Sequence, residues 1–391
     1  MVGQETQIVM PIFLIFGGVA LLSTLALFTR QSMLIAYMVA GILLGPDCLN
    51  LVGNAQLMRH TGDIGIIFLL FLLGLHLPPQ KLIGMMKKIS IVGLVSSFLF
   101  FFIGFIVAFL FGFSIQICSV IGAAMMFSST IIGIKLLPTT VLHHQHTGEV
   151  MISVLLFQDL IAIVVLLVMR AVSLGSSLVH DTLYVLIGFP LVLIFAFFFE
   201  RYVLIVLFKR FSRMKEYLFL LSIAWCLGLS ALAYYLKLSV EIGAFIAGVS
   251  LATSPISVYI AESLKPVRDF FLVLFFFSVG ALFKLSFFVS VFEPALLLAV
   301  GLFVVKPLVY RYLLVRVGET KKVSWEVGGR LGQISEFSLI IAAAAYKLSL
   351  IDEKAQYLIQ AATMLSFVLS SYWVVMRYPT PVSLSSKLRR D

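Results

Sequence analysis

The chain has 391 residues, of which 61% are hydrophobic and only 12% are charged, and its formal net charge is +10. Soluble globular proteins are about 45–50% apolar and about 25% charged, so this composition excludes soluble enzymes, nucleic-acid binders and disulfide-stapled secreted proteins. At about 20 residues for each membrane-spanning helix, there is room for about 12–14 spans and for no sizeable extramembrane domain.

Thirteen apolar segments, separated by charged residues or by Pro and Gly, predict thirteen helices. Their approximate centres lie at residues 18, 38, 69, 100, 125, 159, 192, 225, 246, 275, 302, 335 and 365. The first segment lacks the basic flank and cleavage site of a signal peptide, so we expect it to be retained. With the N-terminus outside, nineteen Lys and Arg residues fall in inner loops and six in outer loops. By the positive-inside rule, this asymmetry indicates an outer N-terminus and a cytoplasmic C-terminus.

The two halves of the sequence carry similar features at a nearly constant spacing. The Ala-Gly pair at 40–41 matches the Ala-Gly pair at 247–248 with an offset of 207 residues, and Gly74 matches Gly280 with an offset of 206. At the same offset, the polar stretch at 128–130 falls within a second polar stretch, GQISEF. Such matches predict an internal repeat.

The spacing predicts two six-helix repeats in opposite membrane orientations, which is the pattern of secondary transporters. We expect the repeats at residues 8–175 and 215–378, linked by an additional helix at 182–207. The predicted fold is an all-α polytopic membrane domain, 1–378, followed by a cytoplasmic tail, 379–391.

Asp159 lies in the middle of the apolar segment EVMISVLLFQDLIAIVVLLV. A carboxylate at that depth costs at least about 2.5–3.5 kcal/mol on insertion scales, so it indicates a function. We predict that Asp159 binds a monovalent cation or a proton, and that the adjacent Gln158 adds a carbonyl ligand. A structural ion pair of Asp159 with Lys306 or Arg330 is the alternative.

Ser128, Ser129 and Thr130 interrupt the apolar segment before Asp159. Three hydroxyls in a row can form hydrogen bonds back to their own helix, as is common in membrane helices. If the helix is unwound instead, its carbonyl and hydroxyl oxygens can bind an alkali cation. Both interpretations are open at this stage.

Lys306 precedes Pro307 in a later apolar segment, so we expect this helix to bend or break there. We predict that Lys306 is a counter-charge to Asp159 or Glu336, with snorkelling of its side chain to the membrane surface as the alternative. Arg330 and Glu336 flank the stretch LGQIS, and their spacing of six residues does not place them on one helical face. This spacing suits a second broken helix, in which we expect both residues to form structural pairs.

Several other functions lack their signatures in the sequence. There is no Walker loop, Gly-rich phosphate-binding loop or GxSxG motif, so we expect no ATP-driven pump, no enzyme and no cofactor. The three cysteines have no ligand spacing, so we expect no disulfide and no zinc site. His143, His144 and His146 indicate a solvated, pH-responsive loop rather than a metal site.

Four stretches, in this order, resemble the KefB/KefC-type monovalent cation:proton antiporters. They are FSSTIIGIKLL, LLFQDLIAIVVLL, EIGAFIAGVSLATSPISVYIAESLKPVRDFFLVLFFFSVGALF and GQISEFSLII. The similarity extends from about Leu34 to Phe367, which is nearly the whole chain. The resemblance implies a thirteen-helix homodimer of the Na+/H+ antiporter fold with a panel domain and a core domain. In such a core, two broken helices cross beside the ion-binding carboxylate, and transport proceeds by an elevator movement.

The resemblance also implies roles for individual residues. It assigns the ion-binding pair to Gln158 and Asp159, and the first crossing segment to Ser128, Ser129 and Thr130. It assigns the lysine of the helix before the second broken one to Lys306, and the second crossing segment to Gln333 and Glu336. Ser335 stands where the family usually has Gly. Many potassium-efflux members carry a C-terminal nucleotide-binding domain, whereas this chain ends thirteen residues after Tyr378. A truncated chain, a separate regulatory subunit and a short unregulated protein all fit this difference.

The expected function is secondary active exchange of K+, or else Na+, for H+ across the plasma (inner) membrane. We expect electroneutral exchange, because Gln158 is neutral and leaves Asp159 as the one titratable group of the pair. A cation channel or uniporter and a non-transporting membrane sensor are the alternatives.

Overall fold

A computed structural model describes residues 2–29, 31–52, 55–75, 79–135, 146–173, 178–211, 214–236, 238–252, 254 and 257–380. In these ranges, seven helices are long and apolar enough to cross a membrane, and several shorter helices are also apolar. The chain divides into two compact units, and each contains segments from both halves of the sequence.

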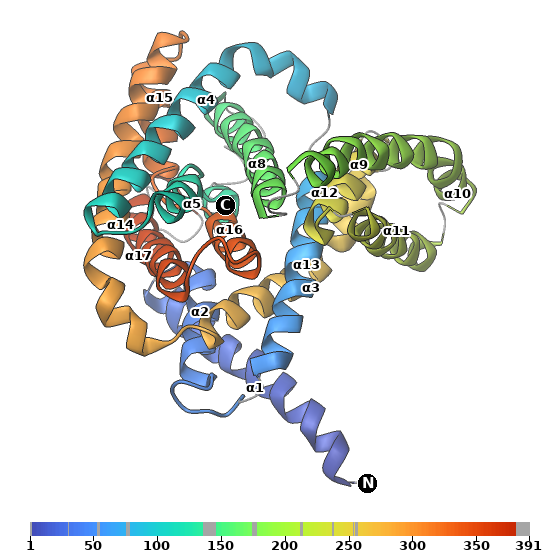
Figure 1. Cartoon of the computed structure of the whole chain (residues 1–391), viewed down its shortest axis with the longest axis horizontal. Helices are drawn as coiled ribbons and strands as arrows, with labels where there is room; N and C mark the ends of the chain where they lie inside the picture. Colours follow the sequence, from blue (N-terminus) through green and yellow to red (C-terminus); the bar gives the residue numbers. More distant parts are fainter. Residues whose placement is uncertain are drawn as a thin grey trace. The chain divides into compact units, whose positions relative to one another are not determined.

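The first unit comprises Met1–Ala55, Met85–Val165 and Val279–Asp391. Its helices are α1 (Val2–Thr29), α2 (Met33–Leu44), most of α4 (Pro79–Leu110), α5 (Ile115–Met125), α6 (Thr130–Lys135), most of α8 (His146–Ser173), α14 (Leu285–Arg316), α15 (Lys321–Arg330), α16 (Glu336–Lys347) and α17 (Glu353–Arg377). α14 packs against α15 and α17, while α16 packs against α5 and α17 (Figure 1). These helices form the body that contains the candidate site.

Side-chain caps define where several of these helices begin. Ser114 Oγ accepts a hydrogen bond from Ile117 N at the start of α5, and Asp352 Oδ1 accepts one from Ala355 N at the start of α17. The first N–H groups of a helix have no partner inside the helix, so such caps fix its starting residue.

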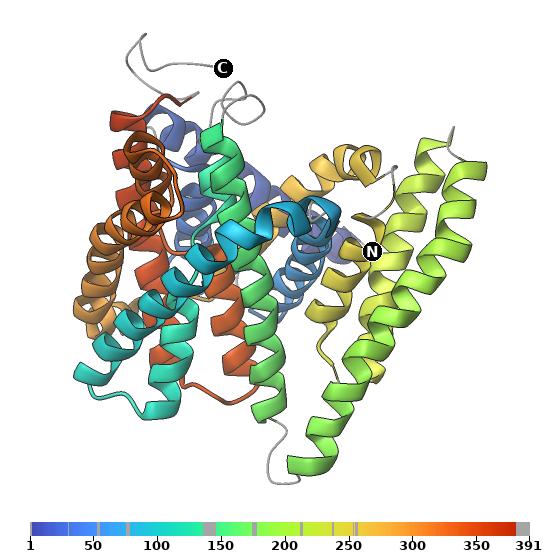
Figure 2. The same ribbon diagram turned by 90° about the horizontal axis from the view of Figure 1, so that it is seen from above.

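The second unit comprises Gln56–Gly84 and Leu166–Ser278. Its elements are most of α3 (Ala55–Leu75), α9 (Leu178–Phe199), the π-helical turn η1 (Glu200–Leu204), α10 (Ile205–Arg210), α11 (Lys215–Tyr235), α12 (Val240–Ala252) and most of α13 (Ser257–Ala281). α9, α11 and α12 pack together (Figures 1 and 2). Trp225 of α11 stacks on Phe199 of α9 with 5.1 Å between ring centroids, and its Nε1 donates to Ala247 O of α12 at 3.2 Å.

Two close helix crossings involve the glycines of the predicted repeat. In the second unit, a Cβ on Gly248 of α12 would lie 2.0 Å from Phe71 O of α3, beside Gly74. In the first unit, a Cβ on Gly280 would lie 2.0 Å from Met38 O of α2. A side chain at either glycine would push the two backbones apart. Each crossing therefore pairs a helix of the first half of the sequence with one of the second half, α3 with α12 and α2 with α13.

Both predicted helix breaks are confirmed. α5 ends at Met125 and α6 begins at Thr130, so the hydroxyl-rich stretch lies at an interruption. α15 ends at Arg330 and α16 begins at Glu336, so these two charged residues are the termini of two half-helices.

Of the bend or break expected beside Lys306, the break is absent. α14 stays helical from Leu285 to Arg316 with Pro294 and Pro307 inside it. A proline removes one backbone donor, but here tertiary packing outweighs that local loss. A Cβ on Gly328 would lie 2.8 Å from Pro307 O, so the backbone of α15 packs directly on this turn of α14.

Candidate functional site

Asp159 lies midway along α8, and its side chain is 1% exposed. Thr130 Oγ1, at the start of α6, is 3.4 Å from each of its carboxylate oxygens and donates to them. Glu336 is near enough for the two carboxylates to repel each other. In the part of the chain that the structure describes, the contacts of Asp159 do not include an ion pair with Lys306 or Arg330.

Gln158 connects the first break to α14. Its Oε1 accepts a hydrogen bond from Ser128 N at 3.0 Å, and its Nε2 donates to Met126 O at 3.2 Å and to Tyr310 Oη at 2.8 Å. The amide is fully buried, so these bonds hold the unwound backbone in a fixed conformation. The oxygen of the predicted carbonyl ligand is thus already an acceptor for the backbone of the break.

The two breaks contact each other directly. Ser128 Oγ donates to Leu331 O at 2.8 Å, and Gln333 Nε2 donates to Ser129 O at 3.3 Å. Gln333 Oε1 in turn accepts from Ser370 Oγ of α17 at 2.8 Å. All of these groups are buried, so the contact is a polar junction inside an apolar body. The crossing of two broken helices is therefore present.

Matching serines cap the half-helices that leave the two breaks. Ser129 Oγ accepts from Ile132 N of α6 at 3.1 Å, and Ser335 Oγ, 206 residues later, accepts from Phe337 N of α16 at 3.1 Å. The hydroxyl of Ser129 thus bonds to its own helix, whereas that of Thr130 faces Asp159. The interruption of the helix favours the second interpretation of the hydroxyl run, under which these oxygens can bind an alkali cation.

A second pair of matching hydrogen bonds fixes the backbone of the breaks. Ser128 N donates a hydrogen bond to Gln158 Oε1 of α8. Ile334 N, 206 residues later, donates one to Ser366 Oγ of α17 at 3.0 Å. The two breaks thus share a backbone hydrogen bond at the offset of 206 residues that also separates Gly74 from Gly280.

We predict different effects for the two neighbouring hydroxyls. Thr130→Val should weaken the apparent cation affinity about 10- to 100-fold, because a hydrogen bond to a charged group contributes about 1.5–3 kcal/mol. Ser129→Ala should lower the free energy of unfolding by about 1 kcal/mol through the lost helix cap, with nearly unchanged affinity. Cation-dependent transport and melting temperature in detergent measure the two effects, and equal affinity losses in both variants would contradict this division.

Lys306 is fully buried between the two breaks. Its Nζ donates to Phe127 O at 2.5 Å, to Gln333 O at 2.9 Å and to Ser128 Oγ at 3.3 Å. The ammonium also lies 5.1 Å from the centroid of the Phe100 ring, which is within reach of a cation–π interaction. These contacts exclude the snorkelling alternative.

The predicted ion pair of Lys306 with Asp159 or Glu336 is not formed among the described residues. The reason lies in the breaks, whose unpaired carbonyl oxygens carry partial negative charge and attract the ammonium. Glu336 lies instead in the first turn of α16, where the positive end of the helix favours a carboxylate.

Arg330 joins the end of α15 to the segment after α17. Its side chain is 1% exposed, and its Nη2 lies 3.0 Å from Glu326 Oε1 and 2.9 Å from Pro379 O. The guanidinium lies 5.1 Å from the Tyr378 ring, and Tyr378 Oη donates to Trp325 O at 3.2 Å. Burial raises the pKa of Tyr378, so its hydroxyl keeps the proton that it donates.

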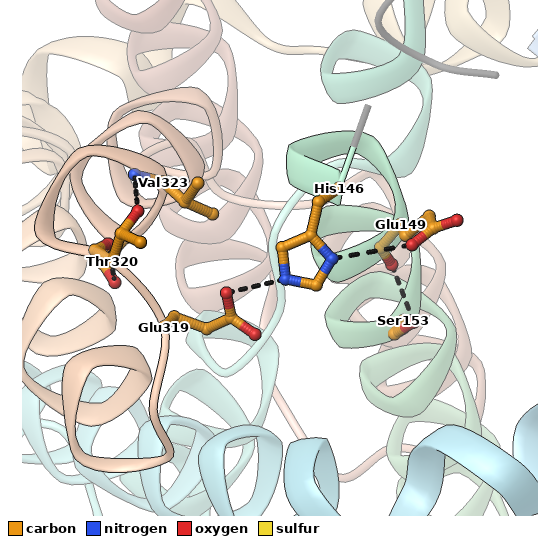
Figure 3. A network of polar contacts seen from close by, with 7 residues as sticks. His146, Glu149, Ser153, Glu319, Thr320 and Val323 are labelled. Atoms are coloured by element: carbon orange, nitrogen blue, oxygen red, sulfur yellow. Dashed lines mark hydrogen bonds and ion pairs between the residues drawn. The ribbon is translucent and has the colours of Figure 1, made fainter. Parts of the chain in front are cut away.

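His146, at the start of α8, lies between two glutamates (Figure 3). Its Nε2 is 2.8 Å from Glu319 Oε2, and its Nδ1 is 3.6 Å from Glu149 Oε2. Glu319 lies between α14 and α15, so this contact ties α8 to the connection that leads into the second broken helix. His143 and His144 lie outside the described residues, within which no cluster of His, Cys, Asp and Glu could hold a metal ion.

Residues 14–376 match the protein family described as "Sodium/hydrogen exchanger, transmembrane". The chain is 28% identical over 352 residues to the iron transporter MagA of Paramagnetospirillum magneticum, which covers 88% of this chain and 80% of that protein. It is also 28% identical over 391 residues to the glutathione-regulated potassium-efflux system protein KefC of Salmonella arizonae. That match covers 95% of this chain but 61% of KefC, so the chain spans less than two thirds of this relative.

The structure is similar to that of the sodium proton antiporter MjNhaP1 from Methanocaldococcus jannaschii. The TM-score is 0.69, and the match covers 93% of this chain and 94% of that chain at 16% sequence identity. At this identity the likeness shows the fold alone. The all-helical Na+/H+ antiporter fold expected from the sequence is confirmed.

Proposed function

The chain belongs to the sodium/hydrogen exchanger family, whose members are multi-pass membrane transporters and not enzymes, and we propose that it exchanges K+ for H+. The observation that carries this proposal is a buried carboxylate in the middle of an apolar helix, Asp159, beside the crossing of two broken helices. The similarity to a potassium-efflux protein favours K+, with Na+ as the alternative cation.

The chemistry of the site supports alternating binding of the two ions. Asp159 and Thr130 offer hard oxygen atoms to a dehydrated alkali cation, and the same carboxylate can take a proton instead. Because the neighbouring Gln158 is neutral, each turnover carries one proton or one cation, and exchange is electroneutral. Glu336 leaves this one-for-one stoichiometry unchanged when its protonation state is the same throughout the transport cycle.

We propose an elevator movement, in which one body carries the bound ion across the membrane. The set of residues that the first unit contains supports it. Both breaks, Asp159 and Lys306 belong to that one unit, so a body that moves as a whole can carry the complete site. We place the protein in the plasma membrane with the N-terminus outside, on the basis of the excess of Lys and Arg in the predicted inner loops.

The proposed partner is a second copy of the chain. The homodimer is supported by the family resemblance. Mass measurement of the purified protein in a mild detergent tests it, and a monomer at micromolar concentration would contradict it.

The function is tested in proteoliposomes that contain a pH-sensitive dye. Addition of K+ outside should raise the internal pH, because K+ enters as H+ leaves, and Na+ and Li+ are compared at equal concentration. The half-saturating K+ concentration should rise as the pH falls, because a protonated Asp159 has no charge for the cation. A pH-independent affinity would contradict competition at one carboxylate.

A clamped membrane potential tests the stoichiometry and the alternatives. With the potential set by an ionophore for an ion that is not transported, one-for-one exchange reaches the same equilibrium at every potential. A shift of that equilibrium with potential would contradict electroneutral exchange. Potential-driven K+ flux without proton movement would identify a channel or uniporter, and no flux of either ion would favour a non-transporting sensor.

A further inference from the structure

Five basic side chains gather at one end of the first unit. α14 ends there, and α15 begins there after a short connection. Tyr378, which directly follows α17, donates to Trp325 O of α15 at 3.2 Å, so the end of α17 lies against α15. All five side chains are exposed, and they form a basic cluster of Arg311, Arg316, Lys321, Lys322 and Arg377.

The charges of the basic cluster are not paired with carboxylates in the part of the chain that the structure describes. The two acids of this region have other partners. Glu319 lies 2.8 Å from His146 Nε2, and Glu326 lies 3.0 Å from Arg330 Nη2. No ion pair among the described residues involves a member of the cluster. The cluster is therefore a strongly positive surface, and the partner that fits it is an anion.

Two arginines of the cluster lie over aromatic rings. Arg311 Cζ is 5.2 Å from the centroid of the Trp325 ring on α15. Arg316 Cζ is 5.1 Å from the centroid of the Tyr312 ring on α14. Such a contact engages the flat face of a guanidinium group and leaves the N–H donors along its edge. These donors match two oxygens of a phosphate group, so the rings hold both arginines in place for a phosphate.

An exposed apolar strip continues from the basic cluster along α14. Its members follow one another at intervals of four residues, which places them on one side of the helix. They are Val300, Val304, Leu308 and Tyr312, and all four are exposed. At a rise of about 1.5 Å per residue, the α14 strip is about 18 Å long. Half of a hydrocarbon core is about 15 Å thick, so the strip is long enough to accompany the acyl chain of one leaflet.

We propose that the basic cluster and the α14 strip bind an anionic phospholipid. Arg311 and Arg316 hold the headgroup phosphate, and an acyl chain lies along the strip. An acidic soluble protein is a poorer partner, because it would meet the charges and leave the strip unmatched.

The bound lipid has a structural effect, because Arg311 belongs to α14 and lies over Trp325 of α15. A phosphate on this arginine strengthens the packing of α14 on the first half of the second broken helix. The lipid site shares no residue with Asp159, Thr130 or the two breaks. The proposal therefore goes beyond the proposed exchange of ions, and lipid binding can be measured whether or not the protein transports a cation.

The test is a lipid titration of the purified, delipidated protein in dodecyl maltoside. Dioleoyl phosphatidylglycerol should raise the melting temperature in a saturable way, and phosphatidylcholine with the same chains should not. Arg311→Gln combined with Arg316→Gln should need at least about tenfold more phosphatidylglycerol for half of the effect, because hydrogen bonds to a charged phosphate are lost. Unchanged lipid affinity in this variant, or equal stabilisation by the two lipids, would overturn the proposal.

Lysine substitutions separate the stacked guanidinium groups from charge alone. Arg311→Lys combined with Arg316→Lys keeps both charges but loses the planar fork that binds two oxygens. Its affinity for phosphatidylglycerol should lie between those of the wild type and the glutamine variant. Wild-type affinity in the lysine variant would contradict the assignment of the headgroup to these two arginines.

Matched controls distinguish the site from a general attraction of anionic lipid to surface charge. Arg210→Gln removes an exposed arginine of the second unit that lies 6.0 Å from the Phe211 ring. Lys354→Gln removes an exposed lysine near the start of α17 that lies 5.5 Å from the Phe113 ring. Both variants should respond to phosphatidylglycerol as the wild type does. A loss in Arg210→Gln as large as in the arginine double variant would reduce the effect to general electrostatics and overturn the site.

Two soluble anions test the source of the negative charge. Glycerol 3-phosphate and pentaglutamate should give no saturable stabilisation at the phosphatidylglycerol concentrations used, because neither has an acyl chain for the α14 strip. Equal stabilisation by glycerol 3-phosphate would indicate a site for a free phosphate, and equal stabilisation by pentaglutamate would indicate an acidic protein partner. Either result would overturn the lipid. If the arginine variants do not fold, the same titrations use Lys321→Gln combined with Lys322→Gln, which should also weaken the response to phosphatidylglycerol.

Discussion

Asp159→Asn is expected to reduce cation-driven proton exchange to the level of protein-free liposomes while the protein stays folded. The amide has nearly the shape of the carboxylate, and its oxygen can still accept the hydrogen bond from Thr130 at 3.4 Å. It cannot bind a proton at neutral pH, and it offers a cation no full charge. Both half-reactions of the exchange are therefore lost together.

The measurement combines transport with a test of folding. The melting temperature in detergent should stay at or above that of the wild type, because an uncharged group replaces a buried carboxylate that is close to Glu336. Glu353→Gln, which neutralises an acid in an exposed ion pair with Lys284, is the matched control and should transport normally. Exchange by Asp159→Asn above background would show that the ion-binding carboxylate lies elsewhere.

The position of the site could be predicted from the sequence because charged and polar residues are costly, and therefore rare, in membrane-spanning segments. Asp159 stands out in an apolar segment, and a run of hydroxyls or a Gly-Gln-Ile-Ser stretch marks helices that fail to continue. The same reasoning located both ends of the second break at Arg330 and Glu336. Charge and polarity in an apolar run thus located the second break, whereas they left two interpretations for the hydroxyl run and allowed a break in α14 that is absent.

The contacts within the site could not be predicted in the same way. Lys306 was expected to pair with a carboxylate, but its partners are the carbonyls of Phe127 and Gln333. Every residue has a carbonyl, so the sequence does not show which ones a helix break leaves unpaired. The unbroken course of α14 through Pro307 has a similar origin, since it depends on tertiary packing against Gly328.

For Gln158, the sequence indicates that the side chain could bind a cation, but it does not show which partners the amide has in the structure. An amide next to a buried carboxylate has the right oxygen for a cation, and the resemblance to known antiporters assigns the pair to ion binding. In the structure, both ends of the amide are engaged by Ser128 N, Met126 O and Tyr310 Oη. Its main effect on transport is therefore expected to come through the conformation of the break.

Gln158→Leu should consequently lower the free energy of unfolding by about 2–6 kcal/mol. The substitution leaves Ser128 N and Met126 O without their buried partner, and each such group costs about 1–3 kcal/mol, whereas Tyr310 Oη keeps Ser128 Oγ at 3.3 Å. The matched control is Ser366→Ala at the equivalent place of the second break, where one hydrogen bond to Ile334 N is lost. That variant should lose about 1–2 kcal/mol, because a single donor remains unpaired.

Gln158→Glu separates the loss of hydrogen bonds from the loss of an oxygen ligand. A carboxylate can still accept from Ser128 N and from the rotated hydroxyl of Tyr310, but it cannot donate to Met126 O. If the amide acts by holding the break, stability should fall in the order wild type, Gln158→Glu, Gln158→Leu, and the cation affinity should fall in the same order. The comparison uses chemical denaturation in detergent together with half-saturating K+ in proteoliposomes. Wild-type stability with lost cation affinity in Gln158→Leu would instead make the amide oxygen a direct ligand of the transported ion.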